Sequence, residues 1–185
     1  MPAAAQDAAQ EPPNVLQAGA YSFSDELGGF RLLSASGRGN GDDPFVLVQE
    51  LESASPVTLV IRATKPIRPF DNSGLFASGF LAMRLEVLNN SGLPWVEFGF
   101  ELQERLGEPS IFSDGLSFDQ RKSESRGTSS DRFATFSRNF EPYDRLLFRE
   151  GHVDAGQTVN FRFLITDFTP RWQFFLVLDP RIPAS

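Results

Sequence analysis

The sequence predicts an all-β fold, an antiparallel β-sandwich that forms a single domain. Three observations favour it: apolar and polar residues alternate along short runs, clusters of Gly, Pro, Asn and Asp separate these runs, and the 185 residues include 19 Phe, 15 Gly and 13 Pro. Phe favours the half-buried surface of a sheet, whereas Gly and Pro mark its turns. The strand spacing fits an immunoglobulin-like or a jelly-roll-like sandwich, and a barrel is the less favoured alternative.

Residues 1–18 are expected to form a flexible N-terminal segment, and residues 19–181 the β-sandwich domain. The first 14 residues have no apolar periodicity and contain three prolines, so they cannot bury enough surface to become ordered. The run Pro-Ala-Ala-Ala-Gln at positions 2–6 is also typical of what remains after a signal peptide has been cleaved. We therefore expect a disordered tail on an exported protein.

The first half of the domain begins with two short strands, over residues 44–51 and 56–62, separated by a Glu-Ser-Ala-Ser turn. One face of the second strand is apolar and carries Val57, Leu59 and Ile61. Prolines, Asn, Ser and Gly then predict a loop over residues 66–74.

The strongest alternation predicts a hairpin between residues 79–88 and a strand that begins at Trp95. The apolar faces of the two runs carry Leu81, Met83, Leu85 and Val87, and Val96, Phe98, Phe100 and Leu102. The intervening Asn-Asn-Ser-Gly is typical of a turn. If the two strands pair, Arg84 lies opposite Glu97 or Glu101.

Residues 106–138 are rich in Ser, Asp, Arg and Gly, which predicts a long excursion with short strands near residues 116–118 and 133–136. Three closing strands follow, over residues 145–149, 157–168 and 172–178. The last of them is apolar on both faces and is therefore expected at the centre of a sheet.

Composition excludes several kinds of chemistry. The chain has no Cys, which excludes thiol nucleophiles, iron–sulfur clusters, cysteine zinc sites and disulfides. His152 is its one histidine, so a multi-histidine metal site cannot form. With 24 acidic and 17 basic residues the net charge is −7, which argues against nucleic acid as a partner. No apolar run reaches the roughly 18 residues of a membrane-spanning helix, so no membrane span is expected.

We expect no enzymatic activity and no catalytic residues. His152 lies between two predicted strands and is interpreted as a surface turn residue, and the chain has no G-x-S-x-G nucleophile motif. Acidic residues, Asp114, Asp119 and Asp144 among them, stand mostly in turn contexts, where Asp caps the backbone. A small hydrolase built on two carboxylates is accordingly the third of three functional hypotheses.

Residues 36–44 form the loop that most resembles a ligand site. Its glycines leave the backbone free to aim carbonyl groups, and Asn40, Asp42 and Asp43 supply the hard oxygen ligands that Ca²⁺ prefers. The loop is similar to a single turn of the calcium repeats of secreted bacterial proteins, which bind calcium in stacks. We expect no cofactor, with calcium at this loop as the hypothesis to test, and a flexible connection as the simpler interpretation.

Two tryptophans are candidate sugar platforms. Trp95 begins its strand in the polar register, which predicts an exposed ring and makes it the candidate ligand-binding residue, whereas Trp172 begins a mostly buried strand. Asn89 heads an Asn-Asn-Ser acceptor pattern for glycosylation, which the chemistry of a turn also explains.

Residues 88–98, Leu-Asn-Asn-Ser-Gly-Leu-Pro-Trp-Val-Glu-Phe, resemble the N-x-(S/T)-G-x-x-W-x-x-F strand turn of the β-sandwich domains that precede PEP-CTERM-type sorting tails in exported bacterial proteins. Residues 147–157, 161–167 and 175–180 are similar to later segments of these domains, so that the resemblance covers scattered pieces of residues 80–180. It implies an extracellular, non-enzymatic sandwich and transfers no functional residue. The chain ends at Ser185 without the Pro-Glu-Pro tail, so anchoring by that route is not expected.

These observations predict a secreted or cell-surface bacterial protein, with the periplasm as the alternative compartment. Its expected role is that of a structural or protein-interaction module of an envelope, matrix or secreted assembly. Loops 36–44 and 114–131 would bind the partner, a protein or a polysaccharide surface. The second hypothesis is a carbohydrate-binding module, with or without calcium. Open sheet edges would also allow oligomers to form by edge pairing.

Overall fold

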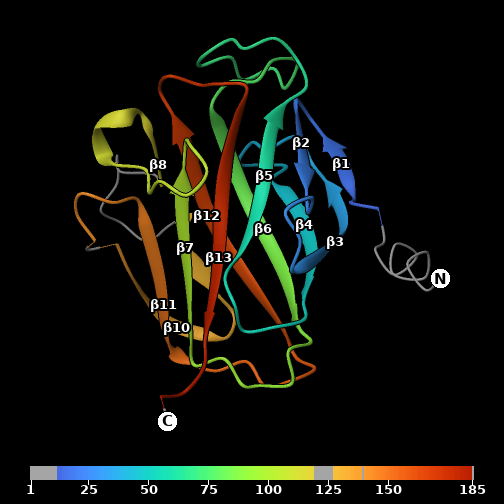
Figure 1. Cartoon of the computed structure of the whole chain (residues 1–185). Helices are drawn as coiled ribbons and strands as arrows, with labels where there is room; N and C mark the ends of the chain where they lie inside the picture. Colours follow the sequence, from blue (N-terminus) through green and yellow to red (C-terminus); the bar gives the residue numbers. More distant parts are fainter. Residues whose placement is uncertain (1–11, 119–126, 139, 185) are drawn as a thin grey trace, which may run out of the picture.

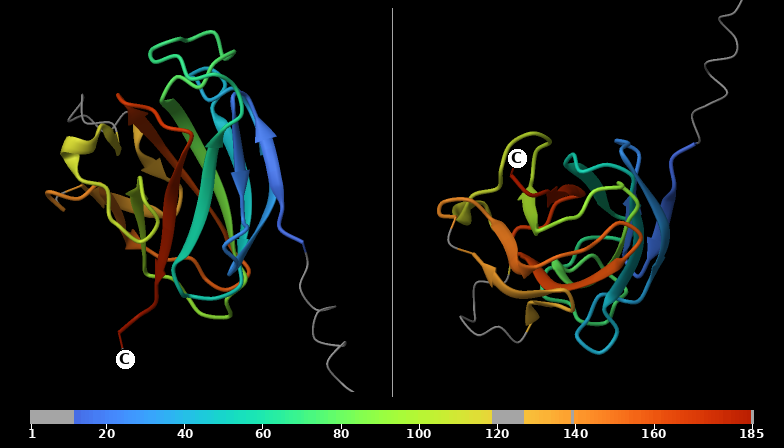
Figure 2. Two further views of the ribbon diagram at one scale, coloured as in Figure 1. Left: turned by 45° about the horizontal axis from the view of Figure 1, so that its top comes forward. Right: turned by 90° about the horizontal axis from the view of Figure 1, so that it is seen from below.

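The computed structural model describes residues 12–118, 127–138 and 140–184 and confirms the predicted β-sandwich. Two open sheets pack face to face (Figures 1 and 2). In spatial order the first sheet contains β1 (Val15–Ala18), β2 (Tyr21–Ser24), β5 (Val57–Ala63), β13 (Gln173–Arg181), β7 (Glu97–Gln103), β11 (Arg145–Gly151) and β10 (Phe133–Ser137). The second contains β3 (Phe30–Ser36), β4 (Phe45–Leu51), β6 (Phe80–Asn89), β12 (Thr158–Asp167) and β8 (Leu116–Phe118), with β9 (Ser129–Ser130) beside β12.

Alternation along the chain predicts β4 to β8 and β10 to β13 because it follows burial, whereas β1, β2, β3 and β9 are not among the predicted strands. In β6 the predicted apolar face, from Leu81 to Val87, is buried, and in β5 Val57, Leu59 and Ile61 are buried. The strand that is apolar on both faces, β13, lies between β5 and β7 inside its sheet, as predicted. The excursion pairs at β8 and β10, also as predicted, and η3 (Phe112–Asp114) is a single 3₁₀ turn.

The predicted hairpin between residues 79–88 and the strand after Trp95 is wrong. β6 pairs with β4, in parallel, and with β12, whereas β7 belongs to the opposite sheet and pairs with β13 and β11. The connection after Asn89 is therefore an arch between sheets. It is held by the buried Asn89 amide, which donates to the carbonyl oxygens of Leu93 (2.8 Å) and Val153 (2.9 Å).

The ion pairs predicted across the hairpin, between Arg84 and Glu97 or Glu101, are not formed either. Glu97 and Glu101 bind Arg149 (2.9 Å) and Arg145 (2.6 Å) on the neighbouring strand β11. Arg84 instead lies 3.4 Å from Glu86 on its own strand.

Phenylalanine rings fill the space between the sheets. The ring of Phe161 on β12 lies 4.7 Å from that of Phe98 and 4.9 Å from those of Phe100 and Phe148, measured between centroids, so it crosses to two strands of the opposite sheet. Aromatic pairs at these separations add about 0.5–1.5 kcal/mol each beyond the burial of their surface.

Sandwich residues begin before the predicted boundary. β1 lies inside the segment predicted to be flexible over residues 1–18, and it pairs with β2. Residues 1–11 of the predicted tail lie outside the described residues. Among the described residues, no helix has the length and apolar character needed to cross a membrane.

Asp25 joins the two sheets along the edge formed by β1 and β3. It is buried, and its carboxylate accepts hydrogen bonds from the amide of Asn14 (2.8 Å) and from the amide of Leu32 on β3 (2.9 Å). The Asn14 side chain donates in return to the carbonyl of Leu32 (3.0 Å). This clamp gives partners to the backbone amide and carbonyl of the buried Leu32, whereas Asn14 is exposed.

We predict that Asp25→Ala lowers the free energy of unfolding by about 2–4 kcal/mol, because it leaves the amides of Leu32 and Asn14 without acceptors. Urea denaturation measures the loss. The control is Asp154→Ala, which removes an exposed turn carboxylate and should change stability by less than about 0.5 kcal/mol. Equal stability of both variants would show that the clamp contributes nothing.

Candidate functional site

A pocket of about 240 Å³ lies at the loop end of the sandwich. Its walls come from the β3–β4 loop, the β5–β6 loop and the end of β12, and in Figure 1 these segments lie at the top, opposite the C-terminus. Five of the lining residues are aromatic: Tyr21, Phe70, Phe76, Phe80 and Phe168. Arg38, Asn40, Asp71, Thr166 and Asp167 add polar groups.

Two glycines allow the loops to close over the strand ends. At Gly39 (φ +88°) a Cβ would lie 2.2 Å from the Phe45 ring, and at Gly79 (φ +79°) it would lie 2.2 Å from the carbonyl oxygen of Asp167. No other residue fits at these positions without displacing its neighbours. The amide of Gly79 also donates to the hydroxyl of Tyr21 (3.0 Å), which joins the β5–β6 loop to the first sheet.

Phe70 occupies a strained position at the mouth of the pocket. Its φ is +65°, in the left-handed region that costs a residue with a Cβ about 1–2 kcal/mol. Its side chain is nonetheless 74% exposed, so burial does not compensate for the strain. The ring lies 6.1 Å from that of Phe168. Strained residues of this kind concentrate at binding sites.

Four exposed apolar residues lie on the loops of this end of the sandwich, and two of them, Phe70 and Phe168, line the pocket. On the loops of this end, Phe70, Leu75, Phe168 and Trp172 are 74%, 64%, 48% and 62% exposed. We call these four residues the apolar rim. Single exposed apolar side chains are ordinary, but a group of them beside a pocket indicates a surface that a partner covers.

Burial shifts the pKa values of two polar groups in the lining. The pKa of Tyr21 is raised to about 12, by burial first and by the neighbouring Asp167 carboxylate, while the hydrogen bond from Gly79 lowers it. The Tyr21 phenol therefore keeps its proton near neutral pH and offers it as a hydrogen-bond donor. Burial also raises the pKa of Asp167, whose Oδ1 accepts a hydrogen bond from the amide of Thr169 (3.0 Å).

The three residues predicted to bind calcium lie in the loop beside the pocket, and Asn40 lines it. Asn40 Oδ1 accepts hydrogen bonds from the amides of Asp42 (3.1 Å) and Asp43 (2.7 Å), which is an Asx turn. The described residues contain no group of three or more His, Cys, Asp or Glu placed to hold a metal ion. The Asx turn holds the loop without an ion, so calcium at Asn40, Asp42 and Asp43 remains a hypothesis to test.

Asn40 Oδ1 already accepts hydrogen bonds from two backbone amides, so it is not free to bind a calcium ion. We therefore predict that 10 mM Ca²⁺ changes the melting temperature by less than about 1 °C relative to EDTA. Differential scanning calorimetry in the two buffers measures the difference. A rise of about 5–10 °C, abolished by Asp42→Asn with Asp43→Asn, would instead establish a calcium site of about 0.1 mM affinity.

The two tryptophans exchange the environments predicted for them. Trp95 is fully buried, 5.4 Å from the ring of Phe98, so the expected exposure is wrong and no ligand reaches this ring in the structure. The arch after β6 turns it inward, because its backbone pairs with Val153 instead of continuing a hairpin. Trp172 precedes β13 and is exposed on the apolar rim.

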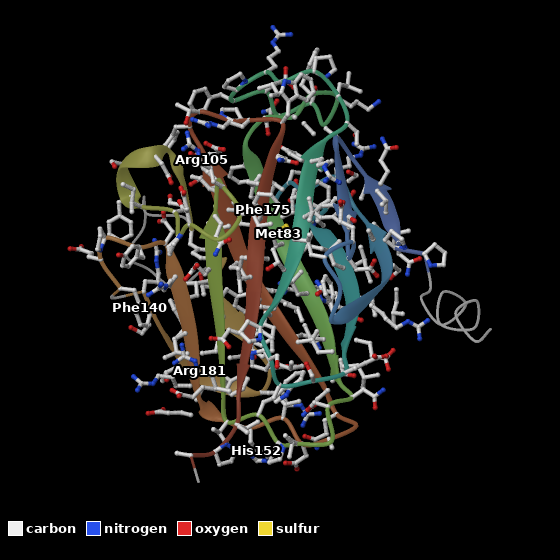
Figure 3. All side chains as sticks on the ribbon, in the orientation of Figure 1. Met83, Arg105, Phe140, His152, Phe175 and Arg181 are labelled. Atoms are coloured by element: carbon white, nitrogen blue, oxygen red, sulfur yellow. The ribbon has the colours of Figure 1, made fainter. Side chains whose placement is uncertain are left out.

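The remaining candidates lie apart from the pocket. His152 is exposed between β11 and β12 at the opposite end (Figure 3), 3.8 Å from Asp154, in keeping with a turn residue. The buried Asn89 amide belongs to the arch, so its acceptor pattern describes a turn. Asp114 and Asp144 converge on the hydroxyl of Ser110, whereas Asp119 lies outside the described residues. Asp144 is 1% exposed and does not line the pocket.

Sequence reasoning identified one wall of the pocket and missed the other. Loop 36–44 was predicted to bind a partner, and it supplies Arg38, Gly39 and Asn40. The β5–β6 loop was interpreted only as a connection. Its signal was Phe70 and Phe76, two large apolar residues in a stretch otherwise rich in Pro, Asp, Asn, Ser and Gly. The other predicted binding loop, 114–131, is described only in part and does not line the pocket.

Comparison of the chain with models of known protein families gives no match, and a search among curated proteins finds none that is significantly similar.

Proposed function

We propose that this protein is a non-enzymatic protein-interaction module of an exported bacterial assembly, and that its end pocket receives an aromatic or branched apolar side chain of a protein partner. The observation that carries the proposal is the aromatic pocket with its apolar rim. Export and a surface location are supported by the resemblance of residues 80–180 to the domains of sorted bacterial surface proteins.

The volume of the pocket suits one side chain. Apolar cavities of about 150 Å³ take up benzene, so 240 Å³ can accommodate a ring together with its attached carbon atoms. The phenol of Tyr21 and the guanidinium of Arg38 lie in the same lining and can bind a polar group on the ring or the partner's backbone. The site thus combines apolar walls with a few polar contacts, as binding sites usually do.

The surroundings of the pocket favour a protein over a free small molecule. Leu75 and Trp172 belong to the rim and are absent from the pocket lining, so their apolar surface lies beyond the reach of a ligand of this size. A partner that places one anchor in the pocket and covers the rim would bury both. Protein interfaces concentrate their binding energy in such anchors, with Trp, Tyr and Arg enriched around them.

We predict that N-acetyl-phenylalanine amide binds the pocket with a dissociation constant on the order of 1 mM, the strength available to a ligand of its size. Backbone amide shifts in an NMR titration should move at Gly39, Gly79 and Phe168 and little elsewhere. N-acetyl-alanine amide, which lacks the ring, should cause no comparable shifts.

Phe70→Ala should weaken this binding about threefold to tenfold, since it removes one aromatic wall. Leu93→Ala, which removes an exposed apolar side chain at the opposite end, is the matched control and should leave the affinity unchanged. The proposal fails if the two capped amino acids give the same shifts, or if Phe70→Ala binds as well as the wild type.

One observation favours carbohydrate binding as the second candidate function. Trp172 is 62% exposed, and a flat, solvent-facing indole is the kind of surface on which a sugar ring stacks. It belongs to the same rim, so a polysaccharide would bind at the same end of the sandwich.

If carbohydrate binding is the function, a gel containing hydroxyethyl cellulose or alginate should retard the wild-type protein, and Trp172→Ala should migrate as it does without polysaccharide. Trp95→Phe is the control, because the buried Trp95 ring is out of reach and its indole nitrogen has no hydrogen-bond partner among the described residues. Unretarded wild-type protein in both gels would remove this candidate.

A further inference from the structure

The hydroxyl of Ser110 has more hydrogen-bond acceptors than it has protons. Its Oγ lies 2.7 Å from Asp114 Oδ2, 2.9 Å from Asp144 Oδ2 and 3.0 Å from the carbonyl oxygen of Leu116. A serine hydroxyl carries one proton, and all three neighbours are acceptors when both carboxyl groups are ionised. The conflict is relieved when one carboxyl group is protonated and donates to Ser110 Oγ, since the Ser110 proton then serves only the other carboxylate and the Leu116 carbonyl.

Asp144 is the carboxyl group that fits the protonated form. It is 1% exposed, and its Oδ1 is buried with no hydrogen-bond partner among the described residues. Asp114 fits the ionised form, because its oxygens also accept hydrogen bonds from the amides of Ile111 (3.1 Å) and Leu116 (3.0 Å). An ionised Asp144 would leave a buried charge poorly compensated, which is costly.

The charged groups around Asp144 act in both directions. The pKa of Asp144 is raised to about 7: burial and the Asp114 carboxylate raise it, while the hydrogen bond with Ser110 and the charge of Arg138 lower it. The charges of Glu104 and Asp167 interact with that of Asp114, and Arg171 lies 3.6 Å from Glu104. Arg138 also donates to the carbonyl of Phe118 (3.1 Å).

Residues 110–118 connect this cluster to the wall of the end pocket. The amide of Asp144 donates to the carbonyl of Ser110 (3.0 Å), which holds the start of the segment. At its other end, Leu116 pairs with Asp167 and the amide of Phe168 donates to the carbonyl of Gly115 (3.0 Å). Asp167 and Phe168 line the pocket, so the segment supports its wall.

We propose that Ser110, Asp114 and Asp144, the Ser110 cluster, form a proton-operated switch that controls the end pocket. With a proton on Asp144, the cluster holds residues 110–118 against the end of β12. When that proton leaves to solvent, Asp114 and Asp144 compete for one hydroxyl proton, and the segment and the pocket wall loosen. The control of ligand affinity rests on the proposed function of the pocket, whereas the switch itself does not.

The sign of the pH effect follows from linkage. A carboxyl group whose pKa is higher in the folded than in the unfolded protein stabilises the fold fully below its unfolded value, about 4, and this stabilisation is lost as pH rises through its folded value. Between pH 6 and pH 8.5 the segment should therefore become less stable, which is the reverse of ordinary acid denaturation.

The first test needs no variant. Carbon-13 NMR of the aspartate carboxyl groups should show that the Asp144 signal titrates near pH 7, well above the usual range around pH 4. If the Asp144 signal titrates in the usual range, the switch does not exist.

The second test measures hydrogen exchange. Protection factors of the Leu116 and Phe168 amides should fall about tenfold from pH 6 to pH 8.5, while those of Leu47 in β4 stay constant. Asp144→Asn should remove most of this pH dependence, since the amide donates to Ser110 at every pH. Glu108→Gln, at an exposed acid of the same excursion, should retain it. An unchanged pH dependence in Asp144→Asn would overturn the proposal.

The third test separates the switch from the pocket. N-acetyl-phenylalanine amide should bind the wild type several-fold more weakly at pH 8.5 than at pH 6, and Asp144→Asn equally at both. If it binds at neither pH, the proposed function fails while exchange and titration still decide the switch. If hydrogen exchange depends on pH but the affinity for N-acetyl-phenylalanine amide does not, the proposal that the switch controls the pocket is refuted.

Discussion

The packing of phenylalanine rings across the gap between the sheets is the constraint on which the rest of the structure depends. Phe161 on β12 contacts Phe98 and Phe100 on β7 and Phe148 on β11, so one ring links the second sheet to two strands of the first. Each sheet must bury its inner face, and this cluster fixes which faces meet. Because the middle of the sandwich is closed in this way, the loop end can keep an aromatic pocket open without loss of the fold.

How much of this could be predicted from sequence depends on whether the signal is local. Most strands from β4 onward were predictable, since alternation records which side chains are buried, but β1, β2 and β3 were not predicted. Strand pairing could not be predicted, because the Asn-Asn-Ser-Gly turn suits a hairpin and an arch equally. Only contacts between residues distant in the sequence, such as Asn89 with Val153, distinguish the two. The same error placed Trp95 at the surface, because register assigns a side chain to a face only when the pairing is known, whereas Trp172 is exposed because β13 begins one residue later.

Of the pocket, too, one part could be predicted from the sequence and another could not. Loop 36–44 has an unusual composition and was predicted to bind a partner. The β5–β6 loop becomes a wall of the pocket only through its contacts with Tyr21 and Phe168, which are distant in the sequence. The Ser110 cluster could not be predicted at all. Asp114 and Asp144 are ordinary turn residues in the sequence, and their chemistry arises because the fold buries Asp144 and places one hydroxyl between the two carboxyl groups. A buried acid of this kind is tolerated when it is neutral.

The central claim is that the aromatic pocket holds the anchor of a partner, and the most direct measurement is the location of a bound ring. Intermolecular nuclear Overhauser effects between N-acetyl-phenylalanine amide and the protein should connect the ligand ring to the side chains of Phe70, Phe80 and Phe168, which line the pocket. Contacts to these three side chains would place the anchor as proposed. Contacts to Trp172 alone, or to residues at the opposite end of the sandwich, would contradict the account.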